Sequence, residues 1–289
     1  MRRQEESLPM LVCRDLPALR SATATLRAGG RSLGLVPTMG ALHAGHLELV
    51  AAARRAADAV AASIFVNPLQ FAANEDLARY PRDEAGDLPK LREAGCDLVW
   101  MPPVEAMYPP GAATIVEVAG PSAGWEGDAR PGHFRGVATV CAKLFLQTGA
   151  EVAAFGEKDW QQLQVVTRMA RDLDIPIRIL PVPTVREADG LAMSSRNRFL
   201  SEAERATAPL LHQVMTRAAA EVLRGAPVDA VLDSGLATLR GAGFAPDYLA
   251  LVEAETLRPL AAPRTGGPMR LLAAARLGSV RLLDNIAVG

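Results

Sequence analysis

The sequence lacks the marks of a secreted, membrane-spanning or disulfide-stabilised protein. Its three cysteines, Cys13, Cys96 and Cys141, are scattered and form no Cys-x-x-Cys pair, which favours a reducing compartment over a disulfide framework. No run of about 18 apolar residues is present. Residues 1–6 are rich in charge, with no apolar core of signal-peptide length behind them. We therefore expect a cytoplasmic protein without a membrane span.

The chain also lacks an excess of charge of either sign. Its 31 lysine and arginine residues balance 32 aspartate and glutamate residues, so nothing in the overall charge indicates nucleic acid or an anionic membrane as a partner. Histidine is scarce, with four residues, and His133 and His212 show no ligand-like spacing to the pair His43 and His46. With no cysteine pair to complete a ligand set, a zinc site is disfavoured.

What is present is typical of a globular enzyme, with 49% hydrophobic and 22% charged residues in a chain of 289. This length allows one large domain or two modest ones.

The most informative segment is residues 37–46, which contains proline and glycine turn signals and two histidines. It follows the apolar run 33–36 and leads into a helical pattern, so it predicts a strand, a turn and a helix that starts near His43. Residues three apart share a helix face, so His43 and His46 can meet one ligand. Free backbone N–H groups at that helix start suit an anion such as a nucleotide phosphate. A surface or capping role for either histidine stays open, as does half of a metal site.

Strand-like and helix-like segments alternate through the first 180 residues, which predicts an α/β fold with a doubly wound parallel sheet. The expected strands are residues 33–36, 59–66, 97–101, 114–118 (as an edge strand), 151–155 and 176–181. The expected helices include residues 83–94, 136–147 and a segment through Gln162 and Met169. Ligands of such sheets bind beyond the carboxyl ends of the strands.

The pattern changes near residue 185. One long alanine-rich helix is expected at 202–224 and another at 228–240, followed by short strands at 248–252, 270–274 and 280–283. Helices followed by strands indicate a separate α+β domain. We expect the domains to be residues 1–184 and 185–289.

Three further polar segments fall where strands should end or loops should lie. They are Asn67 with Gln70, Lys158 with Asp159, and Ser194 and Ser195 with Arg196. The amides suit a small polar ligand, the lysine suits a phosphate, and the hydroxyls with the guanidinium suit a phosphate clamp. Each segment by itself has a plainer interpretation, as a turn or as exposed surface. Their combination indicates a nucleotide site.

Six motifs of the chain lie at residues 36–46, 63–71, 75–82, 130–137, 155–159 and 189–197, with a related tail at 281–285. Together they resemble the pantoate–β-alanine ligase (pantothenate synthetase) family, over nearly the whole chain. The resemblance implies a Rossmann-like nucleotidyltransferase domain, a smaller C-terminal α+β lid domain and a homodimer. It also implies that ATP, (R)-pantoate and β-alanine give pantothenate, AMP and pyrophosphate, with Mg²⁺ as the metal ion.

The same resemblance implies residue roles. The ATP site would comprise Pro37, Met39, Gly40, Ala41, Leu42, His43, Ala44, Gly45, His46, Gly156, Glu157, Lys158, Asp159, Val185, Met193, Ser194, Ser195 and Arg196. The catalytic residues would be His43, His46, Lys158 and Arg196, with His46 as the proton donor. Gln70 would bind pantoate and β-alanine, and Gln162 would bind pantoate. For Mg²⁺, Asp87 alone is in register with the family's acidic residues, and phosphates would supply most ligands.

The chemistry expected from this resemblance has two steps. Pantoate attacks the α-phosphorus of ATP to form an acyl-adenylate, and the amine of β-alanine then attacks that adenylate. Residues 193–196 would close over the site and keep water from the adenylate.

Two alternatives stay open: another adenylyltransferase of the same superfamily, and a nucleotide-binding dimer without catalysis. The segment 67–71, as a pocket for a carboxylate substrate, argues against the first. The intact His43, His46, Lys158 and Arg196 argue against the second.

Overall fold

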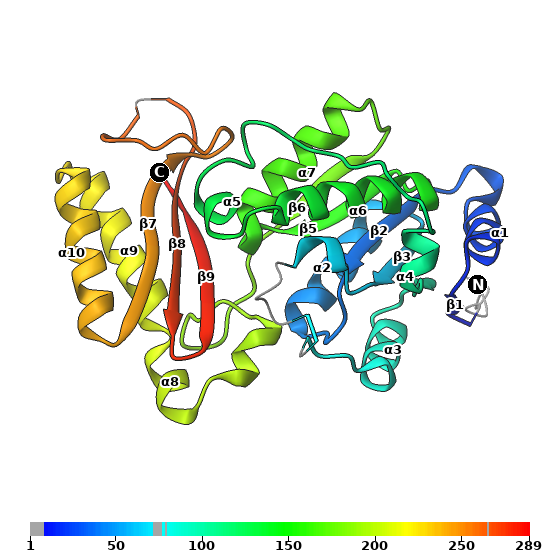
Figure 1. Cartoon of the computed structure of the whole chain (residues 1–289), viewed down its shortest axis with the longest axis horizontal. Coiled ribbons are helices and arrows are strands. Elements are labelled where there is room, and N and C mark those ends of the chain that lie inside the picture. The colour runs from blue at the N-terminus through cyan, green and yellow to red at the C-terminus, as the bar shows by residue number, and fades with distance from the viewer. Residues whose placement is uncertain (1–8, 72–76, 79, 265) are drawn as a thin grey trace, which may run out of the picture.

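The protein is described by a computed structural model that covers residues 9–71, 77–78, 80–264 and 266–289. Figure 1 shows two units side by side. One contains a parallel sheet and the helices that cover it, and the other contains a three-stranded sheet with α9 and α10. The N-terminal unit runs from the first strand to the sixth. Its elements are β1 (Leu11–Cys13), α1 (Leu16–Leu26), η1 (Ala28–Gly30), β2 (Leu33–Thr38), α2 (Ala44–Ala56), β3 (Ala59–Ile64), η2 (Pro68–Gln70), α3 (Glu84–Glu93), β4 (Leu98–Trp100), α4 (Val104–Met107), α5 (Trp125–Ala129), α6 (His133–Thr148), β5 (Val152–Gly156), η3 (Glu157–Asp159), α7 (Trp160–Asp172) and β6 (Arg178–Val182).

The sheet of this unit has the strand order β1-β4-β3-β2-β5-β6, and every pairing is parallel. Alternate residues of β2, β3, β4 and β5 face two separate cores. Leu35 and Ala61 belong to the core under α1, α6 and α7, while Val36 and Val60 belong to the core under α2 and α3. Burial on both faces explains why these strands read as continuous apolar runs in the sequence. The predicted doubly wound α/β fold is confirmed.

One prediction at the edge of this sheet is wrong, and the strand that does form that edge was not predicted. Residues 114–118 form no strand; they run along α6, where the backbone N–H of Val116 donates to Thr139 Oγ1 at 3.0 Å. The edge position beside β4 belongs instead to β1, at Leu11–Cys13. A strand of three residues is too short to show an alternating pattern, which is why the sequence did not reveal it.

The C-terminal unit consists of η4 (Ser195–Phe199), α8 (Glu202–Thr207), α9 (Leu210–Leu223), α10 (Val228–Gly241), β7 (Phe244–Glu253), β8 (Met269–Leu277) and β9 (Val280–Val288). The single helix predicted at 202–224 is therefore two helices. Pro209 separates them, because proline has no N–H to continue the hydrogen-bond ladder of α8. The three strands were predicted in the right places, but each is longer than its apolar segment and pairs antiparallel with its neighbour.

The two faces of the antiparallel sheet have different neighbours. One face packs on α9 and α10 through residues such as Leu271 and Leu282. The other face is turned to the N-terminal unit: Tyr248 OH and Arg281 both bind Glu126 of α5, and Arg270 binds Glu157 of η3. These contacts fix the second sheet beside the edge of the first where its strands end. The division of the chain at residues 184 and 185 stays a prediction.

Candidate active site

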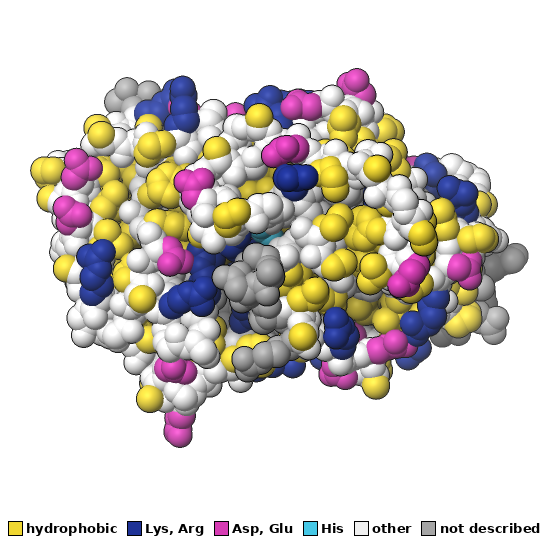
Figure 2. Space-filling model, in the orientation of Figure 1, with side chains coloured by type: hydrophobic (Ala, Val, Ile, Leu, Met, Phe, Trp, Pro, Cys, Tyr) yellow, Lys and Arg dark blue, Asp and Glu magenta, His cyan; other side chains and the backbone are white. Residues whose placement is uncertain are grey.

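The predicted site residues meet at the point where the order of the parallel sheet reverses. β2 and β5 are neighbours there, and the chain leaves them toward opposite faces of the sheet, into α2 and into η3 with α7. Such a reversal leaves a crevice at the carboxyl ends of the two strands, which is where open α/β sheets bind ligands. A cavity of about 240 Å³ lies at this place. In Figure 2 a histidine side chain is visible in the hollow at the centre of the molecule, beside lysine and arginine side chains.

Most of the predicted residues line this cavity. They are Pro37, Met39, His43, Gly45, His46, Gln70, Gly156, Lys158, Asp159, Gln162, Val185, Met193, Ser194, Ser195 and Arg196. Segments that lie far apart in the sequence thus contribute to one wall. Whether each of these residues touches ATP or pantoate stays a prediction.

Gly40, Ala41, Leu42, Ala44 and Glu157 are not among the lining residues. The first three form the turn behind the histidines, and Ala44 is the first residue of α2. The carboxylate of Glu157 turns away to the C-terminal unit, where Arg270 Nη2 lies 2.7 Å from Glu157 Oε2. The cavity lining therefore does not support a place for these five residues in the ATP site, which stays a prediction.

Asp87 holds the turn that precedes α2. It is 0% exposed, and its two carboxylate oxygens accept the backbone N–H groups of Ala41 at 2.7 Å and Leu42 at 2.8 Å. Ala41 and Gly40 both have positive φ angles, 51° and 83°, so this turn needs an anchor. Lys90 Nζ, 3.8 Å from the carboxylate, balances its charge.

This arrangement does not favour a magnesium ligand, because Asp87 is closed to water and each of its oxygens already accepts a backbone N–H. Within the described part of the chain, no group of three or more His, Cys, Asp or Glu residues could hold a metal ion. The structure thus gives Asp87 a role in shaping the turn, and its predicted use for the metal stays a prediction that this position does not favour.

The two histidines cap the helix that carries them. His43 is the N-cap of α2, its Nδ1 accepting the N–H of Gly45 at 3.1 Å, and His46 Nδ1 accepts the N–H of His43 at 3.3 Å. The expectation of free N–H groups at this helix start is therefore wrong for His43 and Gly45. Since each Nδ1 is an acceptor, the proton of each neutral ring is on Nε2. Each histidine can then donate one N–H to a ligand in the cavity.

Both histidines are neutral at pH 7. Burial, followed by the nearby Lys158, lowers the pKa of His43 from 6.5 to about 4. Burial, followed by the contact with His43, lowers the pKa of His46 to about 3, and the two ring centroids are 4.2 Å apart. The site thus offers no imidazolium from His43 or His46 near neutral pH. It provides neutral N–H donors beside a separate cation.

We expect the free energy of unfolding to decrease as the pH falls from 7.5 to 5.5. In the unfolded chain both histidines take up protons near pH 6.5, while in the folded chain their lowered pKa values keep them neutral, so protons favour unfolding. Urea denaturation at both pH values measures this loss of stability. Both pH values lie above the range in which carboxylates titrate, so the change in stability reports on histidines. The double variant His43→Asn, His46→Asn should lose less stability over the same interval. A signal from His43 or His46 that titrates near 6.5 in NMR spectra of the folded protein would contradict the assignment.

Gln70 owes its position to a close contact between η2 and α6. A Cβ on Gly136 of α6 would lie 2.5 Å or less from Leu69 and Gln70 backbone atoms, so only glycine allows this approach. Asn67 is 1% exposed, and its Nδ2 donates to Gln70 Oε1 and to Gly136 O, both at 3.0 Å. Asn67 was expected to offer its own amide to a ligand, but the structure uses that amide to orient Gln70. The Nε2 group of Gln70 is thereby directed toward Met39 in the cavity wall, at 3.3 Å from the sulfur.

Sequence reasoning missed His133, Arg130 and Tyr80 as cavity residues. His133 was set aside for its spacing from the other histidines, yet its Nδ1 donates to Gln70 O at 2.9 Å and its Nε2 lies 3.0 Å from Arg130 Nη1. The signal that could have found them was the motif at 130–137, which had been used only for the resemblance. In the motif at 75–82, residues 75, 76 and 79 lie outside the described residues.

The segment of residues 194–196 reaches the turn before α2 from the other unit. Ser195 Oγ donates to the carbonyl of Ala41 at 3.0 Å, and Ser194 Oγ caps η4 by accepting the N–H of Arg196 at 3.3 Å. The guanidinium of Arg196 is 5.9 Å from the centre of the Tyr80 ring. The two hydroxyls thus have structural partners, and the closing motion of this segment stays a prediction.

No helix in the described ranges is both long and apolar enough to cross a membrane.

Comparison with known proteins identifies relatives over almost the full chain. The model of the pantoate-beta-alanine ligase family matches residues 11–287. The pantothenate synthetase of Acidiphilium cryptum (strain JF-5) is 60% identical over 280 residues, which cover 96% of this chain and 100% of that protein. The pantothenate synthetase of Granulibacter bethesdensis is 53% identical over 277 residues, which cover 96% of each chain.

Solved structures agree with these sequence relatives. The pantothenate synthetase from Thermus thermophilus superposes with a TM-score of 0.90 at 49% identity and covers 96% of this chain and 99% of that chain. A pantoate-beta-alanine ligase from Francisella tularensis, complexed with beta-gamma ATP and beta-alanine, superposes with a TM-score of 0.79 at 30% identity, covering 96% and 97% of the two chains. The chain therefore belongs to the pantoate-beta-alanine ligase family.

Proposed function

We propose that this protein condenses (R)-pantoate with β-alanine to pantothenate, using ATP and releasing AMP and pyrophosphate. The observation that carries the proposal is the cavity in which two neutral histidines and Lys158 lie with Gln70 and Gln162. The first group suits the phosphates of a nucleotide, and the two amides suit the hydroxyls and carboxylate of a small acid. The Francisella tularensis relative, complexed with beta-gamma ATP and beta-alanine, supports ATP and β-alanine as substrates.

In the first step a carboxylate oxygen of pantoate attacks the α-phosphorus of ATP. The new O–P bond forms while the bond between the α-phosphorus and pyrophosphate breaks, and negative charge develops on the phosphate oxygens. The Nε2–H groups of His43 and His46, with Lys158 and Arg196, would stabilise this charge. Donors fixed in advance by the fold are effective because they need no reorganisation during the reaction. His46 would act as a hydrogen-bond donor to the phosphate, through the N–H that its capping bond places on Nε2, and as a neutral ring it would keep that proton rather than transfer it as the resemblance implied.

In the second step the amine of β-alanine attacks the acyl carbon of the adenylate. The amide bond forms, the bond to AMP breaks, and the amine loses a proton to solvent or to AMP. Proximity supplies most of this acceleration, since the adenylate is already reactive. Gln70 would hold both acids, and Gln162 would hold pantoate.

We propose that Mg²⁺ enters with the phosphates of ATP. The described cavity wall has no carboxylate cluster for it, and the position of Asp87 does not favour it as a ligand. Mg²⁺ commonly takes most of its ligands from phosphates and water. A homodimer and a cytoplasmic location are also proposed, on the family resemblance and on the composition respectively.

The decisive experiment is pantoate-dependent exchange of labelled pyrophosphate into ATP, with Mg²⁺ and without β-alanine. Exchange would show that the acyl-adenylate forms reversibly and that pantoate is the acid. ATP binding without pantoate-dependent exchange would move the assignment to another adenylyltransferase or to a non-catalytic nucleotide-binding protein.

We expect Gln70→Ala to raise the KM for pantoate about tenfold, since the variant loses a hydrogen-bond donor that Asn67 has already oriented. The KM for ATP should change little, because the histidines and Lys158 are untouched. Gln164→Ala is a matched control, since Gln164 lies on α7 outside the cavity wall. An unchanged pantoate KM and rate in Gln70→Ala would remove Gln70 from the proposal.

A further inference from the structure

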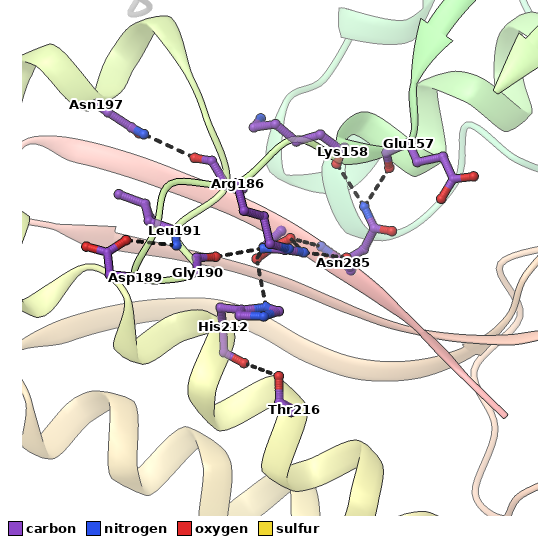
Figure 3. A network of polar contacts seen from close by, with 12 residues as sticks. Glu157, Lys158, Arg186, Asp189, Gly190, Leu191, Asn197, His212, Thr216 and Asn285 are labelled. Carbon is purple, nitrogen blue, oxygen red and sulfur yellow. Dashed lines mark hydrogen bonds and ion pairs between the residues drawn. The ribbon is translucent and has the colours of Figure 1, made fainter. Parts of the chain in front are cut away.

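The turn that carries Lys158 is held by a residue of the C-terminal unit. η3 is a single 3₁₀ turn, and its N-cap, Gly156, offers no side chain to stabilise it. The Nδ2 group of Asn285, on β9, donates to the carbonyl oxygens of Glu157 and Lys158, both at 2.8 Å. Figure 3 shows these two bonds, with the Lys158 side chain pointing away from Asn285. One amide from the second sheet therefore fixes the backbone on both sides of Lys158.

Asn285 is itself tightly fixed. It is 4% exposed, and its Oδ1 accepts a bond from Arg270 Nη1, so its nitrogen is the atom that faces the two carbonyls. Arg270 also pairs with the carboxylate of Glu157 at 2.7 Å and stacks on the ring of Trp160, 3.4 Å from its centre. Neighbouring donors and acceptors thus leave the Asn285 amide a single orientation.

The preceding residue, Asp284, faces the opposite side of the sheet, as alternate residues of a strand do. It is 3% exposed, and Arg186 binds both of its oxygens, at 2.6 and 2.9 Å. Asp284 Oδ1 accepts the backbone N–H of Asn285 at 2.7 Å, and His212 Nδ1 lies 3.6 Å from Oδ2. Figure 3 shows Arg186, His212 and Asn285 meeting at this point.

Arg186 belongs to the connection that leads to the segment 194–196. This connection is a short hairpin, closed by a bridge between Arg186 and Ala192 and by the bond from Met193 N to Val185 O at 3.0 Å. Asn285 therefore holds the turn that carries Lys158, and Asp284 holds the hairpin that leads to Arg196. Two neighbouring residues of β9 thus contact the segments that carry both of these cations.

We propose that Asn285 is a positioning residue for Lys158, and that residues 284 and 285 of β9 set the spacing between Lys158 and the segment 194–196. This inference rests on the proposed role of Lys158 as a phosphate ligand. The C-terminal unit then acts in ATP binding through its strand β9, by holding a backbone turn whose own N-cap, Gly156, has no side chain.

The test is ATP binding measured by calorimetry on the full chain. Asn285→Ala should bind ATP about tenfold more weakly, because two partly buried carbonyls lose their donor and the turn loses its anchor. Asn285→Asp should do the same while keeping the volume and the Arg270 contact, since its oxygen would face two carbonyl oxygens. Tyr248→Phe is the control: it removes one bond between the same sheet and α5 but does not reach η3.

A double-mutant cycle separates positioning from general destabilisation. If Asn285 acts through Lys158, then Lys158→Ala with Asn285→Ala should bind ATP as weakly as Lys158→Ala alone. Effects that multiply in the double variant, or an Asn285 effect no larger than that of Tyr248→Phe, would overturn the inference. Failure of the proposed function shows separately, as wild-type protein that binds ATP but gives no pantoate-dependent exchange.

Discussion

Lys158→Ala is expected to lower the rate of pantoate-dependent pyrophosphate exchange by roughly 10²–10³-fold, the usual cost of losing one fixed donor to a developing charge. Lys158 lies close enough to the two capped histidines that its charge contributes to the lowered pKa of both rings. Because those rings are neutral, they cannot replace the lost positive charge.

The measurement is the exchange rate at saturating and at limiting pantoate. We expect kcat to fall and the KM for pantoate to stay nearly constant, since the two glutamines that would hold pantoate lie on other elements. Lys143→Ala, on α6 and outside the cavity wall, is the matched control and should exchange like the wild type. A Lys158→Ala variant within roughly threefold of the wild-type rate would show that the phosphates are held elsewhere.

Asp87→Ala is expected to destabilise the protein by about 2–5 kcal/mol. The substitution leaves two buried N–H groups, those of Ala41 and Leu42, without an acceptor and removes the carboxylate that pairs with Lys90. It also frees a turn whose positive φ at Ala41 is costly without an anchor. Since His43 follows this turn, activity should fall together with stability.

Urea denaturation measures the stability, and a titration of activity against Mg²⁺ tests whether Asp87 binds the metal instead. Asp83→Ala is a matched control, because Asp83 caps the same helix at its exposed end and its loss should cost only about 0.5–2 kcal/mol. If the Asp87→Ala variant is as stable as the wild type but requires a higher Mg²⁺ concentration for activity, then Asp87 is a metal ligand and its structural role is refuted.

The sequence by itself determined the class of fold and the location of the site. Apolar runs such as 59–66 and the helical spacing after His46 predict their elements because buried parallel strands and amphipathic helices leave different periodicities in the chain. The turn residues between these elements show that the polar segments follow the ends of strands. The carboxyl ends of parallel strands lie along one edge of the sheet, so the polar segments are expected to meet there. These properties are local, so they can be recognised from short stretches of consecutive residues.

Only the tertiary structure decided how individual polar side chains are used. In the sequence, Asp87 is a plausible metal ligand and Asn67 is a plausible binding residue for a small polar molecule. In the structure, each side chain instead forms a hydrogen bond with a residue distant along the chain. His133 was set aside for its spacing, and Asn285 was noted only as part of the tail at 281–285, yet both hold site residues. The partner of a buried polar group is chosen by packing across the fold, because any available donor or acceptor must be satisfied there. That choice depends on distances between segments, which the linear order of residues does not contain.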